Sequence, residues 1–247
     1  MILSEAERKL FFSFYDGKKE GSLSLYILTS CFMDNNSPRF SLALITFSAL
    51  YMLIAIMAAI RQGNTEFVFY IVVMAVLITS LVLVHRRVNF SNGVLWGMSC
   101  WGLLHMAGGL VRLPEAFTEN GAQPVLYSWW IITDLLKYDQ VVHTYGFGIT
   151  TWVCWQILRS NIKKQTGQSP EPSYGLCILS AAGGMGFGAL NEMIEFIATL
   201  TIPETNVGGY NNTGWDLVFN LIGCALAAII IRQGHARESQ GIAEMNS

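Results

Sequence analysis

The stretch GGMGFGALNEMIEFIATLTIPETNVGGYNNTGWDLVFNLIG, residues 183–223, decides how this chain folds. It consists of two apolar segments joined by a short loop, and its polar residues inside or at the rim of those segments are Glu192, Glu195, Asp216 and Asn220. A carboxylate in lipid is costly unless it is paired, liganded or hydrated, so these residues are functional candidates. On helices, spacings of three and four residues put each pair on one face.

The composition of the whole chain is that of a membrane protein. Of 247 residues, 52% are hydrophobic and only 13% are charged, whereas soluble domains carry about 25% charged residues. The net charge of −2, without a long basic run, gives no indication of a basic surface that would bind nucleic acid. The five cysteines form no CxxC motif, which argues against a disulfide framework or a thiolate metal site. We predict an all-α, polytopic membrane protein.

Six segments are apolar enough to cross a bilayer, which needs roughly 20 residues. The apolar pieces at 23–33 and 125–136 are too short, so we expect a surface or re-entrant helix at the first. At the second, between spans three and four, we expect an interfacial or re-entrant segment, with an interfacial helix as its form. The predicted spans are 40–60, 67–84, 94–111, 140–158, 174–200 and 215–231. The predicted domains are a cytoplasmic or interfacial segment, the six-helix membrane domain and a cytoplasmic tail, at 1–39, 40–232 and 233–247.

The lysines and arginines predict the orientation of these spans. Twelve of the fifteen fall on the side that holds both termini, and the other side has only Arg61, Arg112 and Lys137. Positive charge accumulates on the cytoplasmic side, so both termini are expected there. A seventh span at 125–136 would reverse everything after it and move Arg159 outside, so we reject that topology.

In this topology, polar residues of four spans lie at one depth, within about 15 Å of the outer boundary. They are His105 on the third span, Asp139 and His143 on the fourth, Glu192 and Glu195 on the fifth, and Asp216 and Asn220 on the sixth. The inner halves of the predicted spans carry no acid or histidine. The same faces carry glycines that allow close packing, namely Gly109, Gly146, Gly188 and Gly223. We expect a pocket open to the outer leaflet, covered by the loop 201–214, with Thr213 capping a helix that begins near Trp215.

Four ordered motifs carry a family resemblance. LHMAGG at 104–109, KYDQVVHTYGFG at 137–148, GALNEMIEF at 188–196 and GGYNNTGWDLVFNLIG at 208–223 resemble the uncharacterised bacterial inner-membrane proteins of the YjdF type. More distantly, the series Asp-x-x-x-His, Glu-x-x-Glu or Gln, Asp-x-x-x-Asn-x-x-Gly is similar to the VanZ-like membrane proteins, which are associated with low-level teicoplanin tolerance. The residues on that series are Asp139, His143, Glu192, Asp216, Asn220 and Gly223. The resemblance implies a multi-pass protein of the bacterial inner membrane, without an established reaction.

Two kinds of chemistry fit these residues. In the first hypothesis a divalent metal, such as zinc or a non-haem metal, is bound by His105, His143, Glu192 and Asp216 and activates a water against a lipid ester or phosphoester. The second is acid/base chemistry without a metal, with His143 held beside Asp139 as the base. The candidate catalytic residues are Asp139, His143, Glu192, Glu195, Asp216 and Asn220.

These hypotheses leave three classes of function open. The first is an integral membrane protein that binds or acts on a lipid or envelope amphiphile, as a membrane-embedded hydrolase or transferase if it is an enzyme. The second is a non-catalytic membrane factor whose polar network only fixes helix packing. The third is an ion-coupled transporter, which is disfavoured because the polar residues stop halfway through the spans. The expected partners are the lipid bilayer and an amphiphilic substrate, with no nucleic acid.

Overall fold

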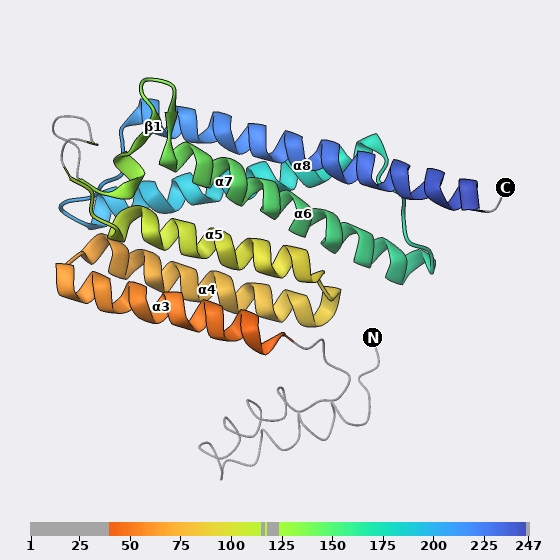
Figure 1. The fold of residues 1–247 in the computed structure, drawn as a ribbon, viewed down its shortest axis with the longest axis horizontal. Helices are drawn as coiled ribbons and strands as arrows, with labels where there is room; N and C mark the ends of the chain where they lie inside the picture. The colour runs from red at the N-terminus through yellow and green to blue at the C-terminus, as the bar shows by residue number, and fades with distance from the viewer. Residues whose placement is uncertain (1–39, 115–116, 118–123, 246–247) are drawn as a thin grey trace, which may run out of the picture. The chain divides into compact units, whose positions relative to one another are not determined.

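Six α-helices form the part of the chain that a computed structural model describes, residues 40–114, 117 and 124–245. The helices are α3 (Leu42–Gln62), α4 (Thr65–Val88), α5 (Asn92–Leu110), α6 (Tyr138–Thr166), α7 (Tyr174–Thr201) and α8 (Tyr210–Met245) (Figure 1). Each contains most or all of one predicted span, so the helical fold class is confirmed. The prediction of a surface or re-entrant helix at 23–33 lies outside the described residues.

The helix starts follow from local sequence. Ser41, Ser91 and Ser173 cap α3, α5 and α7, each with its side chain accepting a hydrogen bond from a backbone N–H in the first turn. Between α3 and α4 the chain turns at Gly63, whose φ of 63° is left-handed, and Asn64 then caps α4. A left-handed residue next to a capping side chain permits a tight turn, so α3 and α4 are joined almost directly.

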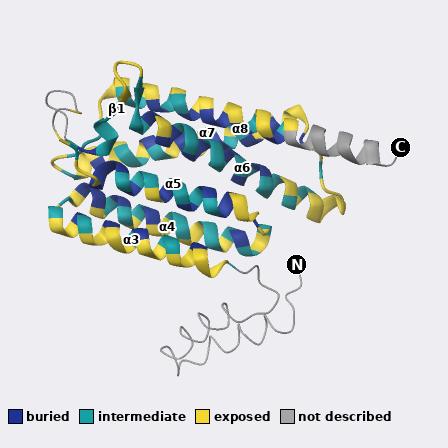
Figure 2. Ribbon diagram, viewed as in Figure 1, coloured by how far each residue is buried: buried dark blue, intermediate teal, exposed yellow. Residues whose placement is uncertain are grey.

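Four of the six helices, α3, α4, α7 and α8, are long and apolar enough to cross a membrane. Their apolar side chains are largely uncovered. Only 17% of the most apolar 18-residue stretch of α4 is buried, and Leu42 on α3 is 78% exposed. Figure 2 shows exposed residues along the length of α3. So much exposed apolar surface is unusual for a monomeric soluble protein and suits a lipid environment. The helices α5 and α6 do not meet the same criteria of length and apolar composition.

The helices α6, α7 and α8 pack against one another, and α5 packs against both α3 and α6. Two glycines bring α8 close to its neighbours. A Cβ on Gly188 of α7 would lie 2.7 Å from Asn220 Nδ2, and a Cβ on Gly223 of α8 would overlap the backbone carbonyl of Thr144 on α6. The prediction that these glycine faces pack together is confirmed.

The segment between α5 and α6 differs from the predicted interfacial helix. It forms a 3₁₀ turn, Leu126–Ser128, followed by an antiparallel hairpin of β1 (Trp130–Ile132) and β2 (Leu136–Lys137). Asp134 has a φ of 57° in the turn between the strands. The aromatic and β-branched residues of β1 favour a strand, and a short apolar run does not distinguish a strand from a helix by periodicity alone.

The start and end of α8 also differ from the prediction. The helix begins at Tyr210, before Trp215, so Thr213 lies inside its first turn and does not cap it. It continues to Met245, through the predicted tail. The loops that join α3 to α4, α5 to α6 and α7 to α8 all lie at one end of the helices, on the left of Figure 1. We call this end the loop-rich end.

Candidate functional site

The imidazole of His143 lies at the centre of the polar residues near the loop-rich end. His143 and Asp139 are one turn apart on α6, and His143 is 6% exposed. Its Nε2 is 3.5 Å from Asp139 Oδ1, and its Nδ1 is 2.9 Å from Asn220 Oδ1 and 3.8 Å from Glu192 Oε1. Both ring nitrogens therefore face polar groups, from three different helices.

Helix α7 supplies two carboxylates to this centre, as the Glu-x-x-Glu spacing predicts. Glu192 is 8% exposed, and neither of its carboxylate oxygens has a partner in hydrogen-bonding geometry among the described residues. Glu195 differs, because its Oε1 accepts a hydrogen bond of 2.8 Å from Asn191 Nδ2. Glu192 is thus a buried acid without a hydrogen bond among the described residues, and its Oε1 faces His143 Nδ1 at ion-pair distance.

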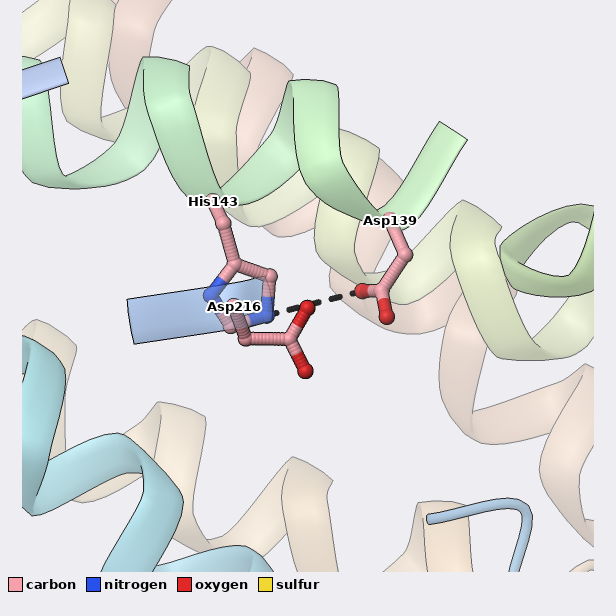
Figure 3. A group of neighbouring side chains, drawn as sticks. All are labelled: Asp139, His143 and Asp216. Carbon is pink, nitrogen blue, oxygen red and sulfur yellow. Dashed lines mark ion pairs between the residues drawn. The ribbon is translucent and has the colours of Figure 1, made fainter. Parts of the chain in front are cut away.

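Helix α8 supplies Asp216 and Asn220, whose exposures are 1% and 0%. Asp216 Oδ2 accepts a hydrogen bond of 2.5 Å from Asn212 Nδ2, one turn earlier. Asn220 Nδ2 has no hydrogen-bond partner among the described residues. Figure 3 shows the carboxylates of Asp139 and Asp216 on the same side of the His143 ring.

Two groups of these side chains are close enough to share a metal ion. The first is Asp139, His143 and Asp216, and the second is His143, Glu192 and Glu195. In each group one ligand atom per residue lies within 4.8 Å of the others. With Asn220, which is paired to His143, the structure brings the other five candidate catalytic residues together around the imidazole of His143. Their roles stay predictions.

His105, the remaining candidate metal ligand, lies in an aromatic cluster and belongs to neither group. Its Nδ1 is 2.5 Å from the hydroxyl of Tyr127, and its ring stacks on Trp101 with centroids 5.4 Å apart. Burial raises the pKa of Tyr127 well above its usual value, so the hydroxyl keeps its proton and can donate it to His105. A small pocket separates His105 from His143, with walls that include Trp101, Val142 and Phe147.

Two buried polar residues were missed at the ends of the predicted spans. Glu66 is 5% exposed, and its Oε2 accepts a hydrogen bond of 2.9 Å from the backbone N–H of Asn206 in the α7–α8 loop. His85 is 2% exposed, and its Nδ1 accepts from the backbone N–H of Phe90. Because α4 continues to Val88, His85 lies within the helix, beyond residue 84 where the predicted span ends. The caps Asn64 and Asn89 were the sequence signals for these boundaries.

The geometry at His143 suits two elementary tasks. An imidazole with carboxylates near both ring nitrogens can accept a proton on one side and release it on the other. Imidazole nitrogen and carboxylate oxygens are also ligands for divalent cations. Both tasks need space beside the ring, and a small pocket lies next to His143.

Among the comparisons with known proteins, a family model identifies a membrane protein. A family model described as "Predicted membrane protein (DUF2238)" matches residues 43–237, which include most or all of every described helix. An uncharacterised protein of Thermotoga maritima is 31% identical over 102 residues, which are 40% of this chain and 50% of that protein. The chain thus spans about half the length of this curated relative. No solved structure matches the chain.

Proposed function

The chain belongs to the DUF2238 family of membrane proteins, and we propose that its His143 centre binds or acts on a lipid or envelope amphiphile. This family includes the YjdF-type proteins. The more distant likeness to VanZ-like proteins stays a prediction. By the His143 centre we mean Asp139, His143, Glu192, Glu195, Asp216 and Asn220.

All six helices cross the membrane in this proposal. The helices α5 and α6 are less apolar than the other four, but α6 is in contact with α5, α7 and α8, so neighbouring helices cover much of its surface. Membrane helices carry polar side chains on faces that look into the bundle. In this proposal the loop-rich end lies outside and both termini lie in the cytoplasm of a bacterial cell, an orientation that the distribution of lysine and arginine supports. The pocket then lies in the outer half of the membrane.

One observation carries the proposal, namely the unsatisfied carboxylate of Glu192. A buried carboxylate without a hydrogen bond destabilises the folded chain by about 1–3 kcal/mol or more. Its nearest cationic candidate is His143 Nδ1, and their separation of 3.8 Å is too long for a hydrogen bond. A residue placed at such a cost in a pocket suggests a role with a ligand rather than in packing.

An amphiphile matches the surroundings of this pocket. Its lining is apolar at Trp101, Val142 and Phe147 and polar at His105, His143 and Asn191. The nearby surfaces of α7 and α8 expose large apolar side chains, including Phe196, which is 61% exposed. In this proposal the pocket, which has room for about one water molecule, widens to admit a polar head group while the chain stays in lipid. In an enzymatic reaction His143 would move the proton and the nearby carboxylates would position it.

The test is a comparison of lipid and envelope extracts by mass spectrometry. Cells that lack the protein receive the wild type, Glu192→Gln, Asp216→Asn or, as a control, Glu66→Gln, a buried acid outside the His143 centre. We expect an amphiphile whose level changes about tenfold or more with the wild type and the control, and not with the other two variants. All four proteins should reach equal membrane levels.

Three other outcomes would contradict the proposal. Loss of Glu192→Gln and Asp216→Asn from the membrane, with the control retained, would assign the centre to helix packing. If both variants change the amphiphile level as much as the wild type does, the His143 centre is not needed for the function. Gradient-dependent solute uptake into sealed vesicles, lost in both variants, would assign an ion-coupled transporter instead.

A further inference from the structure

We propose that α6 and α7 hold a divalent cation between His143, Glu192 and Glu195. This inference deepens the proposed function and rests on it, because the cation would be a resident part of the His143 centre. It narrows the metal hypothesis to three of the residues that the structure brings together and leaves His105 out.

The ligand atoms are spaced as a cation requires. One nitrogen of His143 and one oxygen each of Glu192 and Glu195 lie within 4.8 Å of one another. Ligands at about 2.0–2.2 Å from a metal are about 3–4 Å apart. The three side chains therefore need only small rotations to close on one ion. Glu192 and Glu195 share a face of α7, so both approach from the same side.

The state of Glu192 points independently to a ligand. Its side chain is more than nine-tenths buried, and its two oxygens have no hydrogen-bond partner among the described residues. The 3.8 Å gap between its Oε1 and His143 Nδ1 leaves this facing pair without a direct bond. A cation between them would replace the proton that His143 Nδ1 donates to Asn220 Oδ1, so that Nδ1 and a Glu192 oxygen could both bind it.

The neighbours of the three ligands hold them in position. Asp139 Oδ1 lies 3.5 Å from His143 Nε2, on the side of the ring away from Glu192. A metal-bound histidine usually gives its other ring N–H to a carboxylate, which fixes the ring and strengthens the ligand. On α7, Asn191 donates to Glu195 Oε1 and leaves the other oxygen free to bind. Asn220 Oδ1, 2.9 Å from His143 Nδ1, is placed to become a fourth ligand.

The donor set selects a class of metal. One imidazole nitrogen with carboxylate and amide oxygens suits Mn²⁺, Fe²⁺ or Zn²⁺, whereas soft ions prefer thiolates. The alternative group, Asp139, His143 and Asp216, suits the same ions. It is the weaker candidate, because it lacks Glu192, the buried carboxylate whose two oxygens have no hydrogen-bond partner among the described residues.

The experiment measures metal binding without any substrate. The full chain is purified in a mild detergent, stripped with a chelator and titrated with Co²⁺, whose visible spectrum reports its ligands, and with Mn²⁺, followed by elemental analysis. We expect about one ion per chain, with proton release on binding. Glu192→Gln should raise the dissociation constant at least about tenfold, because even the loss of a supporting residue around a metal costs 10–100-fold.

Two variants serve as controls. Glu66→Gln removes a buried acid that donates no atom to the site, and it should bind like the wild type. Asp216→Asn should keep the ion with at most a modest loss of affinity. If Glu192→Gln does not elute as a folded protein, Glu195→Gln takes its place.

The inference is overturned if the wild type binds no more Co²⁺ or Mn²⁺ than Glu192→Gln. It is also overturned if Asp216→Asn loses the ion while Glu192→Gln keeps it, since the cation would then lie in the other group. Absence of metal with a variant-sensitive amphiphile would leave the proposed function standing alone. Metal binding without any change in an amphiphile would support the metal site and contradict the proposed function.

Discussion

Gly223→Ala should remove most of the folded protein from the membrane. A Cβ at this position of α8 would overlap the carbonyl oxygen and carbon of Thr144 on α6. Both partners are helix backbone, so no side-chain rotation can relieve the overlap, and α6 must move away from α8. The displacement would also break the hydrogen bond of 3.2 Å from Thr144 Oγ1 to the Phe219 carbonyl. We expect a loss of about 3 kcal/mol or more, the upper range for overpacking.

Gly186→Ala is the matched control, because nothing lies within 4 Å of a Cβ at this position of α7. It should keep or raise the apparent melting temperature, since alanine favours a helix over glycine by about 1 kcal/mol. Folded yield and melting temperature in detergent provide the measurement. Equal stability of the two variants would mean that α6 and α8 do not pack as described.

Glu195→Gln should raise the stability of the metal-free protein. Four carboxylates, those of Asp139, Glu192, Glu195 and Asp216, lie around the single imidazole of His143. Like charges in a poorly hydrated site repel, so removing one should stabilise the fold by about 1 kcal/mol. Glutamine keeps an oxygen that can accept from Asn191. In chelator at neutral pH the apparent melting temperature should rise by about 2–4 °C.

A centre that serves only packing would respond in the opposite way, and Glu195→Gln would then melt lower than the wild type. Glu66→Ala serves as the reference for a loss of stability that comes from removing a packing contact. It leaves the backbone N–H of Asn206 without its acceptor and should lower the melting temperature. If the site binds a cation, added Mn²⁺ should stabilise the wild type more than Glu195→Gln and reduce the difference between them.

The helices could be predicted from the sequence because long apolar segments bounded by turn and capping residues leave few alternatives. The approach of Glu192, Asp216 and His143 to one end was predictable too. It follows from the rise per residue and from the alternation of helix direction. These arguments fix the depth of a side chain along its helix.

They do not fix the rotation of a helix about its axis, and here the prediction reached its limit. His105 has a depth that suits the centre, but α5 turns it toward Tyr127 and Trp101. The hairpin after α5 was missed because its apolar run is too short to show a period. Glu66 was missed because it lies in the first turn of α4 and looks in the sequence like a residue of the preceding loop.

The central claim is that carboxylates from three helices surround the ring of His143. Nitrogen-15 NMR of the imidazoles in the metal-free protein tests it most directly. The four histidines of the chain can be assigned by replacing each in turn. Glu192→Gln and Asp216→Asn should each shift the ring nitrogens of His143 and leave those of His85 unchanged. If neither substitution moves the His143 signals, the three helices do not meet at this residue and the proposed site does not exist.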